Sequence, residues 1–272
     1  MGNGQRYEVI AHNTATTSTN RIHDDDVARR YGFGGGLVPG VDVYAYMTRP
    51  AAATWGLDWL AGGTMRARFL SPVYDGRTVV VTGGEPTSTP TGPTLAIEVR
   101  ADDGTLCATG EAGLPDPGGD GPSASTWPDV APAARPPEAS PESLAPGTPL
   151  RLPAHRFRAA EAGAYLADVR EDLPLYEDAH VAHPGWLLRD ANHVLGSNVR
   201  LGPWIHVESR VRHLSLVRDG DAVEARAVVT REWEHKGHRF VELDVGLLAD
   251  GERPVAQVIH TAIYRPRDPA VT

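Results

Sequence analysis

The sequence predicts an α+β protein made of two similar units in tandem, each a long apolar helix wrapped by an antiparallel sheet. In both halves a Pro-Gly pair opens an apolar, helix-like stretch, with Gly40 in the first half and Gly185 in the second. An Asp-Gly pair, typical of a tight hairpin turn, follows at Gly76, 36 residues after Gly40, and at Gly220, 35 residues after Gly185. A second Asp-Gly pair comes 28 and 31 residues later, at Gly104 and Gly251. Three landmarks in one order at nearly equal spacing indicate a fused repeat.

A proline-rich stretch divides the chain. Of its 23 prolines, 10 lie between 114 and 150, among many Gly, Ser and Ala residues and very few large aliphatic ones. Such a composition buries too little apolar surface to offset the entropy of ordering, which is typical of a linker. We therefore expect a first unit at 1–113, a linker at 114–150 and a second unit at 151–272.

The elements of the first unit follow in order. A short strand is expected at 7–12, where Val9 and Ile10 are apolar. A polar overhanging segment comes next, and then a buried helix from about Val41 to Arg49 that restarts at Pro50, because proline favours the first turn of a helix. Alternating β-rich runs then predict strands at 65–73, 77–84, 94–101 and 105–114.

The second unit has the same plan. Its helix follows Gly185, and its β-rich runs predict strands at 205–217, 222–233, 239–249 and 254–264. A helix that is apolar on most faces, beside strands that alternate, is what a helix enclosed by an antiparallel sheet requires.

Composition excludes several classes of protein. Apolar residues make up 41 % of the chain, and 26 Lys and Arg against 35 Asp and Glu give a net charge of −9. The chain has no basic run of the kind that nucleic-acid binding needs and no apolar run long enough for a membrane helix. The first twelve residues lack the apolar core of a secretory signal, and a single cysteine, Cys107, excludes an intrachain disulfide and a multi-thiolate zinc site. We expect a cytoplasmic protein without a metal or other cofactor.

The segment from Thr17 to Gly40 carries the clearest functional motif. It resembles the motif of the MaoC-like dehydratase and (R)-specific enoyl-CoA hydratase family, Asp-x-Asn-Pro-(Leu/Ile)-His followed by Ala, Gly-Phe and a closing aliphatic-x-Gly. The positions that match are Asn20, Ile22, His23, Ala28, Gly32-Phe33, Leu37-Val38 and Gly40. Three positions depart from the motif: Arg21 replaces the usual Pro, Pro39 replaces a common His, and Ser18 stands where the catalytic Asp belongs.

The resemblance implies a double-hotdog fold and thioester chemistry. In that family the Asp and His hold a water molecule and manage its proton, and the closing Gly polarises the thioester carbonyl through its backbone N–H. Carried over, His23 would be the acid/base, Gly40 the oxyanion donor, and Asn20 would position water or substrate. Val38 and Tyr44 would contact the substrate beside Gly40.

Ser18 leaves the base of the reaction open, because a hydroxyl is not a general base at neutral pH unless another base activates it. The role would pass to Asp24, Asp42 or a residue of the second unit, or His23 would act alone. Each candidate also has a structural alternative. Ser18 and Asn20 would stabilise a turn, Asp24 and its neighbours would cap a helix, Asp42 would be a solvent-facing acid, and Gly40 would permit close packing.

The sequence thus predicts a lyase of the hydratase or dehydratase type, acting on an α,β-unsaturated or 3-hydroxy acyl thioester of CoA or a carrier protein. Two alternatives stay open because of Ser18: a hotdog tailoring enzyme, such as a cyclase, a conjugate-addition catalyst or a thioesterase, and a non-catalytic acyl-binding protein. The second unit has Pro184-Gly185 but no Asn-x-x-His motif, so one site per chain is expected. A homodimer is also left open, and no nucleic acid or membrane partner is expected.

Overall fold

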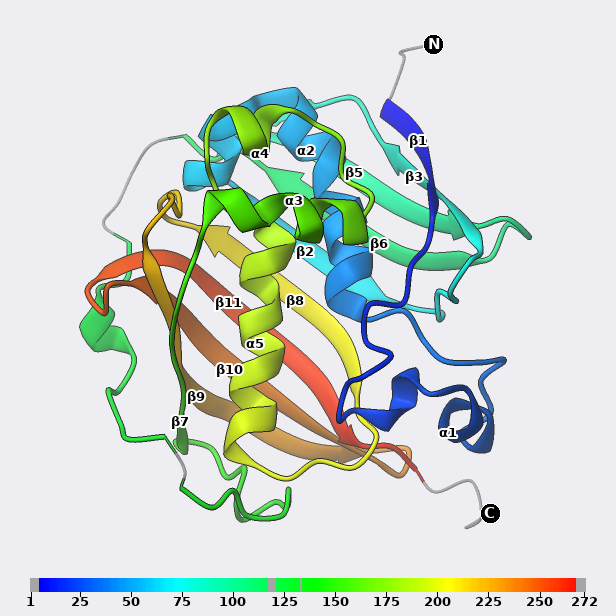
Figure 1. Ribbon diagram of the computed structural model, residues 1–272, viewed down its shortest axis with the longest axis vertical. Coiled ribbons are helices and arrows are strands. Elements are labelled where there is room, and N and C mark those ends of the chain that lie inside the picture. Colours follow the sequence, from blue (N-terminus) through cyan, green and yellow to red (C-terminus); the bar gives the residue numbers. More distant parts are fainter. Residues whose placement is uncertain (1–4, 117–120, 133, 268–272) are drawn as a thin grey trace.

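The computed structural model describes residues 5–116, 121–132 and 134–267, and within them the strands form one 11-stranded antiparallel sheet (Figure 1). The first half contains β1 (Gln5–Ile10), η1 (Arg21–His23), α1 (Asp25–Arg30), α2 (Gly40–Gly62), β2 (Thr64–Phe69), β3 (Thr78–Gly83), β4 (Thr87–Thr89), β5 (Gly92–Ala101) and β6 (Leu106–Gly113). The second half contains η2 (Ala124–Thr126), β7 (Pro149–Arg156), α3 (Ala159–Asp168), α4 (Leu175–Asp178), α5 (Pro184–Asn198), β8 (Ile205–His213), β9 (Ala222–His235), β10 (His238–Ala249) and β11 (Arg253–Arg265).

The order of the strands reveals the internal repeat. It runs β1-β3-β5-β6-β2-β8-β11-β10-β9-β7, with β4 attached to β5, so the second half mirrors the first about the β2–β8 pair. That central pair is antiparallel and runs from Thr64 opposite Arg212 to Arg68 opposite Glu208. One continuous sheet therefore runs across both halves, while the unit boundaries at 113 and 150 stay a prediction.

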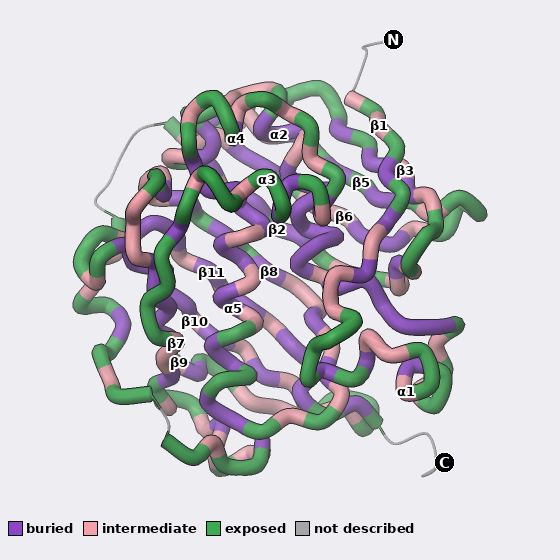
Figure 2. The backbone as a smooth tube through the Cα atoms, in the orientation of Figure 1, coloured by how far each residue is buried: buried purple, intermediate pink, exposed green. Residues whose placement is uncertain are grey.

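The two long helices α2 and α5 lie on one face of the sheet, and buried residues gather where they meet it (Figures 1 and 2). They also pack against each other: a Cβ atom added to Gly185 would lie 2.7 Å from the Cβ atom of Ala45. No helix in the described ranges is long and apolar enough to span a lipid bilayer. This packing brings the N-terminal ends of both helices against strands or helices of the other half.

The predicted strands are all present, but the predicted helix boundary at Pro50 is wrong. Helix α2 continues through Pro50 and is interrupted only at Gly56, where φ is 57° and ψ is −137°. A proline removes the N–H that would bond to the carbonyl four residues earlier, here that of Tyr46. The hydroxyl of Tyr7 donates to this carbonyl instead, so the helix continues without an unpaired acceptor.

The segment expected to be a linker packs against the second half of the sheet. Trp127 and Leu144 are buried within the described residues, and the Trp127 indole N–H donates to Asp244 Oδ1 at 3.0 Å. The aromatic ring lies over Gly246, where a Cβ atom would come within 2.2 Å of it. A few apolar residues are enough to hold this segment against the sheet, because one indole buries a large area. A count of aliphatic residues alone underestimates that area.

Candidate active site

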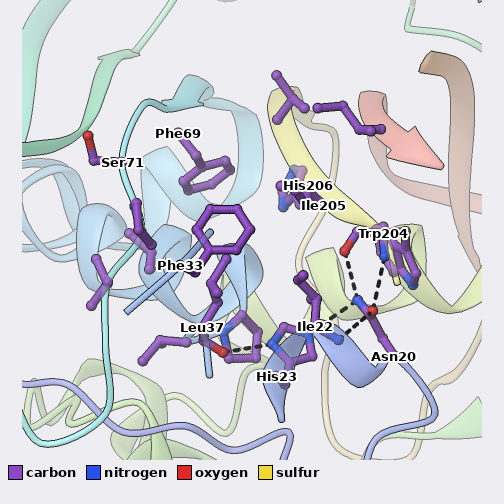
Figure 3. A pocket seen from close by; sticks show the side chains of 18 of the residues that line it. Asn20, Ile22, His23, Phe33, Leu37, Phe69, Ser71, Trp204, Ile205 and His206 are labelled. Atoms are coloured by element: carbon purple, nitrogen blue, oxygen red, sulfur yellow. Dashed lines mark hydrogen bonds between the residues drawn. The ribbon is translucent and has the colours of Figure 1, made fainter. Parts of the chain in front are cut away.

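An apolar cavity of about 330 Å³ lies where the motif segment meets the second half of the chain (Figure 3). The wall from the first half comes from the motif, the start of α2, the end of β2 and the segment that follows it. The wall from the second half comes from the start of β8 and from single residues of α5, β10 and β11. Its apolar lining includes Ile22, Phe33, Leu37, Val38, Val43, Phe69, Leu70, Val73, Trp204 and Ile205. Its polar lining includes Asn20, His23, Asn192 and His206.

Asn20 connects the two halves at this cavity. Its amide makes two hydrogen bonds with the backbone of Trp204, accepting from the N–H at 3.1 Å and donating to the carbonyl at 3.0 Å. The same side-chain oxygen accepts from the Ile22 N–H at 3.3 Å and so caps η1. The Asn20 amide nitrogen also lies 3.4 Å from His23 Nε2. Asn20 therefore holds the motif in place and faces the histidine that follows.

His23 is fixed in one tautomer. Its Nδ1 atom lies 2.7 Å from the Leu37 carbonyl oxygen, which can only accept, so Nδ1 carries the proton and Nε2 keeps a lone pair. Nε2 is the nitrogen that faces Asn20 (Figure 3). Burial lowers the pKa of His23 below its usual value of 6.5, although the bond to Leu37 acts in the opposite direction. The ring is therefore a neutral base at physiological pH.

Helix α2 begins at the cavity with unpaired donors. Gly40 lines the cavity, and its N-cap residue, Pro39, supplies no side-chain hydrogen bond. Among the described residues no backbone acceptor pairs with the N–H of Gly40 or of Val41. Free N–H groups at the positive end of a helix dipole favour an oxygen that carries negative charge.

The other predicted site residues lie elsewhere. Ser18 is exposed and its Oγ accepts from the Asn20 N–H at 3.1 Å; it lines a separate polar cavity of about 480 Å³ that also contacts Asn20 and His23. Asp42 is fully buried and accepts from Arg189 of α5 at 2.8 Å and from the Thr14 hydroxyl at 2.6 Å. Asp42 is thus an ion-pair partner between the halves, not the solvent-facing acid considered from the sequence.

Tyr44 and Val38 differ in their placement. Tyr44 is fully buried in the core and lines neither cavity, whereas Val38 lines the apolar one. Asp24 caps α1 by accepting from the N–H groups of Asp26 and Val27 at 3.1 and 3.2 Å. The structure therefore brings Asn20, His23, Val38 and Gly40 together and places Ser18, Asp42 and Tyr44 outside the apolar cavity.

The second half supplies site residues that the motif did not indicate. Trp204, just before β8, and His206, near the start of β8, both line the apolar cavity. Asn192 lines both cavities, and its side-chain oxygen has no partner among the described residues. In the described chain no three His, Cys, Asp or Glu side chains are grouped as metal ligands.

Comparison with known proteins establishes the fold. No family model and no curated protein sequence matches the chain. A conserved hypothetical protein of Mycobacterium tuberculosis, Rv0216, which has a double hotdog fold, matches with a TM-score of 0.60 at 15 % identity, over 97 % of this chain and 96 % of that chain. This chain has the double-hotdog fold.

Other solved hotdog structures carry names of different activities. A protein assigned to the MaoC domain dehydratases, from Chloroflexus aurantiacus, matches with a TM-score of 0.63 at 11 % identity, over 97 % of this chain and 96 % of that chain. One assigned to the thioesterases, from Novosphingobium aromaticivorans, matches with a TM-score of 0.55 at 14 % identity, over 96 % and 95 % of the two chains. The predicted fold is confirmed, and its neighbours include both dehydratases and thioesterases.

Proposed function

We propose that the chain is a hydro-lyase that adds water to an α,β-unsaturated acyl thioester, or removes it from the 3-hydroxy acyl thioester. The observation that carries this proposal is the pairing of a neutral, buried imidazole with the uncapped start of a long helix at one apolar cavity. A base and an oxyanion site beside an apolar acyl-binding surface are the parts that conjugate addition to a thioester requires.

Hydration would proceed as follows. His23 Nε2 takes a proton from water as the water oxygen bonds to the β-carbon of the enoyl group. The electron pair of the double bond shifts toward the thioester, whose oxygen becomes the enolate oxygen and accepts from the Gly40 N–H. The protonated His23 then returns its proton to the α-carbon, and the carbonyl is restored. Dehydration is the reverse sequence.

In this proposal His23 handles the proton without a carboxylate partner. Asp42 is committed to Arg189 and Thr14, and Ser18 bonds to the backbone. The Asn20 amide, at 3.4 Å from Nε2, positions the ring and the water. The apolar lining favours the acyl group over its polar carrier, and the carrier itself is CoA or a carrier protein.

Thioester hydrolysis is the second candidate. The same water, activated by His23, would attack the carbonyl carbon and expel the thiol, with the same N–H groups binding the oxyanion. Where the dehydratase motif has its catalytic Asp, this chain has Ser18, which is exposed and does not line the apolar cavity. This replacement favours the alternative. A protein assigned to the thioesterases is also among the hotdog neighbours.

Two assays on the purified chain separate these reactions. We expect crotonyl-CoA to lose its enoyl absorbance and butyryl-CoA to release no free thiol. Thiol release from butyryl-CoA without hydration of crotonyl-CoA would replace the lyase by a thioesterase. Binding of both thioesters without turnover of either would leave only an acyl-binding protein.

A further inference from the structure

A buried row of polar side chains under the start of α2 is not used in the proposed reaction. His206 and Ser209 lie on β8 and His260 lies on β11, with exposed fractions of 7 %, 0 % and 0 %. His206 Nε2 lies 2.8 Å from Ser209 Oγ, which lies 3.0 Å from His260 Nδ1. The three side chains form a hydrogen-bonded row from the cavity wall into the core.

A β-bulge brings this row together. His206 and Ser209 are three residues apart, so a regular strand would place them on opposite faces of the sheet. In the pairing of β8 with β11, however, Glu208 and His206 lie opposite neighbouring residues, which leaves Val207 as an extra residue. The bulge turns His206 to the face of Ser209, toward α2 and the cavity. Bulges often orient a side chain at a functional site.

Unpaired polar atoms stand at both ends of the row. His206 Nδ1 and His260 Nε2 are buried and have no partner among the described residues. His206 lines the cavity in the close-up view (Figure 3), and its Nδ1 would lie only 2.9 Å from a Cβ atom on Gly40. An unpaired imidazole nitrogen and the unpaired Gly40 N–H therefore occur side by side at the start of α2.

The Ser209 hydroxyl couples the tautomers of the two imidazoles, because it donates one hydrogen and accepts another. If it donates to His260 Nδ1, His260 must carry its proton on Nε2, as an N–H in the core with no acceptor. If it donates to His206 Nε2, it accepts from the Nδ1–H of His260, whose Nε2 then carries no proton. His206 in turn carries its proton on Nδ1, at the cavity. In either arrangement one buried N–H has no acceptor in the chain, but only His206 lines a cavity that a ligand can enter.

The second arrangement therefore leaves its donor where a bound oxygen can accept from it. We propose that the Nδ1–H of His206 and the N–H of Gly40 together bind the acyl oxygen of the thioester, so that the second half of the chain supplies one of the two oxyanion donors. The reaction in this assignment rests on the proposed function. The binding of an acyl oxygen by the two N–H groups does not depend on it.

Two amide substitutions test the donor by kinetics. In His206→Asn the amide nitrogen takes the place of Nδ1, and in His206→Gln it takes the place of Nε2. We expect His206→Gln to lower kcat/KM for crotonyl-CoA by about 10²- to 10³-fold, the usual effect of losing one oxyanion donor, and His206→Asn to stay within about tenfold of the wild type, since it keeps that donor. His213→Gln, another buried histidine of β8, is the matched control and should keep the wild-type rate. Equal losses in Asn and Gln at position 206 would overturn the proposal.

Nuclear magnetic resonance with ¹⁵N-labelled imidazoles tests the binding geometry without turnover. The His206 signals are those that His206→Gln removes. We expect protonated Nδ1, bare Nε2 and a shift of the Nδ1–H signal on addition of butyryl-CoA. Protonated Nε2 with bare Nδ1, or an unmoved Nδ1–H signal when butyryl-CoA binds, would refute the assignment. If butyryl-CoA shifts the signal while crotonyl-CoA is not hydrated, the lyase proposal fails and the oxyanion site remains.

Discussion

The starts of the two long helices occupy equivalent places in the repeat, but only one of them is capped by a side chain. Helix α2 begins after Pro39, which offers no side-chain acceptor, and Gly40 faces the apolar cavity. Helix α5 begins after His183, whose Nδ1 accepts from the Gly185 N–H at 3.0 Å. In the second half a side chain of the chain itself caps the helix start, whereas in the first half no side chain caps it among the described residues.

The two histidines beside these helices use opposite tautomers. His23 donates from Nδ1 to a carbonyl, so Nε2 is free. His183 accepts at Nδ1, so Nε2 carries the proton, and that nitrogen lies 3.4 Å from the Thr48 hydroxyl and 3.6 Å from Glu171 Oε2. A neutral imidazole has one lone pair. His183 uses its lone pair to cap a helix, whereas His23 keeps its own available for a proton.

Removing the two histidines should give the largest contrast. We expect His23→Ala to lower the rate at least 10²-fold, at the lower end of the effect of losing a general acid/base, with an unchanged melting temperature. His183→Ala should lower the free energy of unfolding by about 2–5 kcal/mol, the cost of a large-to-small change in a core, and leave the rate of the folded fraction unchanged. Enzyme assays and urea denaturation of both variants test this. Full activity in His23→Ala would refute the proposed catalytic role of this histidine.

The two glycines form a second matched pair, because a Cβ atom would meet a neighbour in both. In Gly40→Ala it would lie 2.9 Å from His206 Nδ1, and in Gly185→Ala 2.3 Å from the Tyr165 hydroxyl. We expect Gly40→Ala to lower kcat/KM about 10²-fold, because displacing a catalytic group by about 1 Å has that effect. Gly185→Ala should instead destabilise the fold by about 1–3 kcal/mol through overpacking. Equal rates in the two variants would contradict the distinction between an open and a filled helix start.

The sequence indicated which residues of the Asn20 to Gly40 motif lie together, but not which residues of the second half surround them. The Asn20 to Gly40 motif is local, and so are the turns that define the strands. The partners of these residues are distant: Asp42 meets Arg189 of α5, and His206 faces α2 only because of a bulge. Neither feature leaves a periodic trace in the sequence. The continuation of α2 through Pro50 was not predictable from the sequence either, because it depends on the hydrogen bond that the Tyr7 hydroxyl donates to the Tyr46 carbonyl.

The dependence on pH should separate activity from stability. Burial lowers the pKa of both His23 and His183, so both are neutral near pH 7. The acid limb of kcat/KM should therefore have its midpoint below about 6.5, the ordinary value for histidine. Above a pH of about 6.5 His183 is mostly neutral in both the folded and the unfolded chain. Its titration then adds no pH dependence to the free energy of unfolding. Below this value the unfolded chain binds a proton that the folded chain does not, so stability falls as pH falls.

Other buried histidines add to the same loss of stability. Burial lowers the pKa of His213 to about 4 and that of His260 to about 3. Each such group contributes about 1.4 kcal/mol per pH unit between its two pKa values. Urea denaturation at pH 7, 6 and 5 measures the slope, and His213→Gln should reduce it. A slope of zero over this range would show that these rings do not stay neutral in the folded chain.

The smallest effect is expected at Ser18, which stands where the dehydratase motif has its catalytic Asp. Its exposed Oγ accepts from the Asn20 N–H, and a single exposed turn residue usually changes stability by no more than about 0.5 kcal/mol. Ser18→Ala should therefore change kcat/KM for crotonyl-CoA less than about threefold, on the scale of such a surface substitution. In Ser18→Asp the carboxylate can accept from the same N–H, as Asp does in an Asx turn, so we also expect no gain in rate. A tenfold gain would mean that position 18 reaches the reacting water, and that the first half-site needs a second proton carrier beside His23.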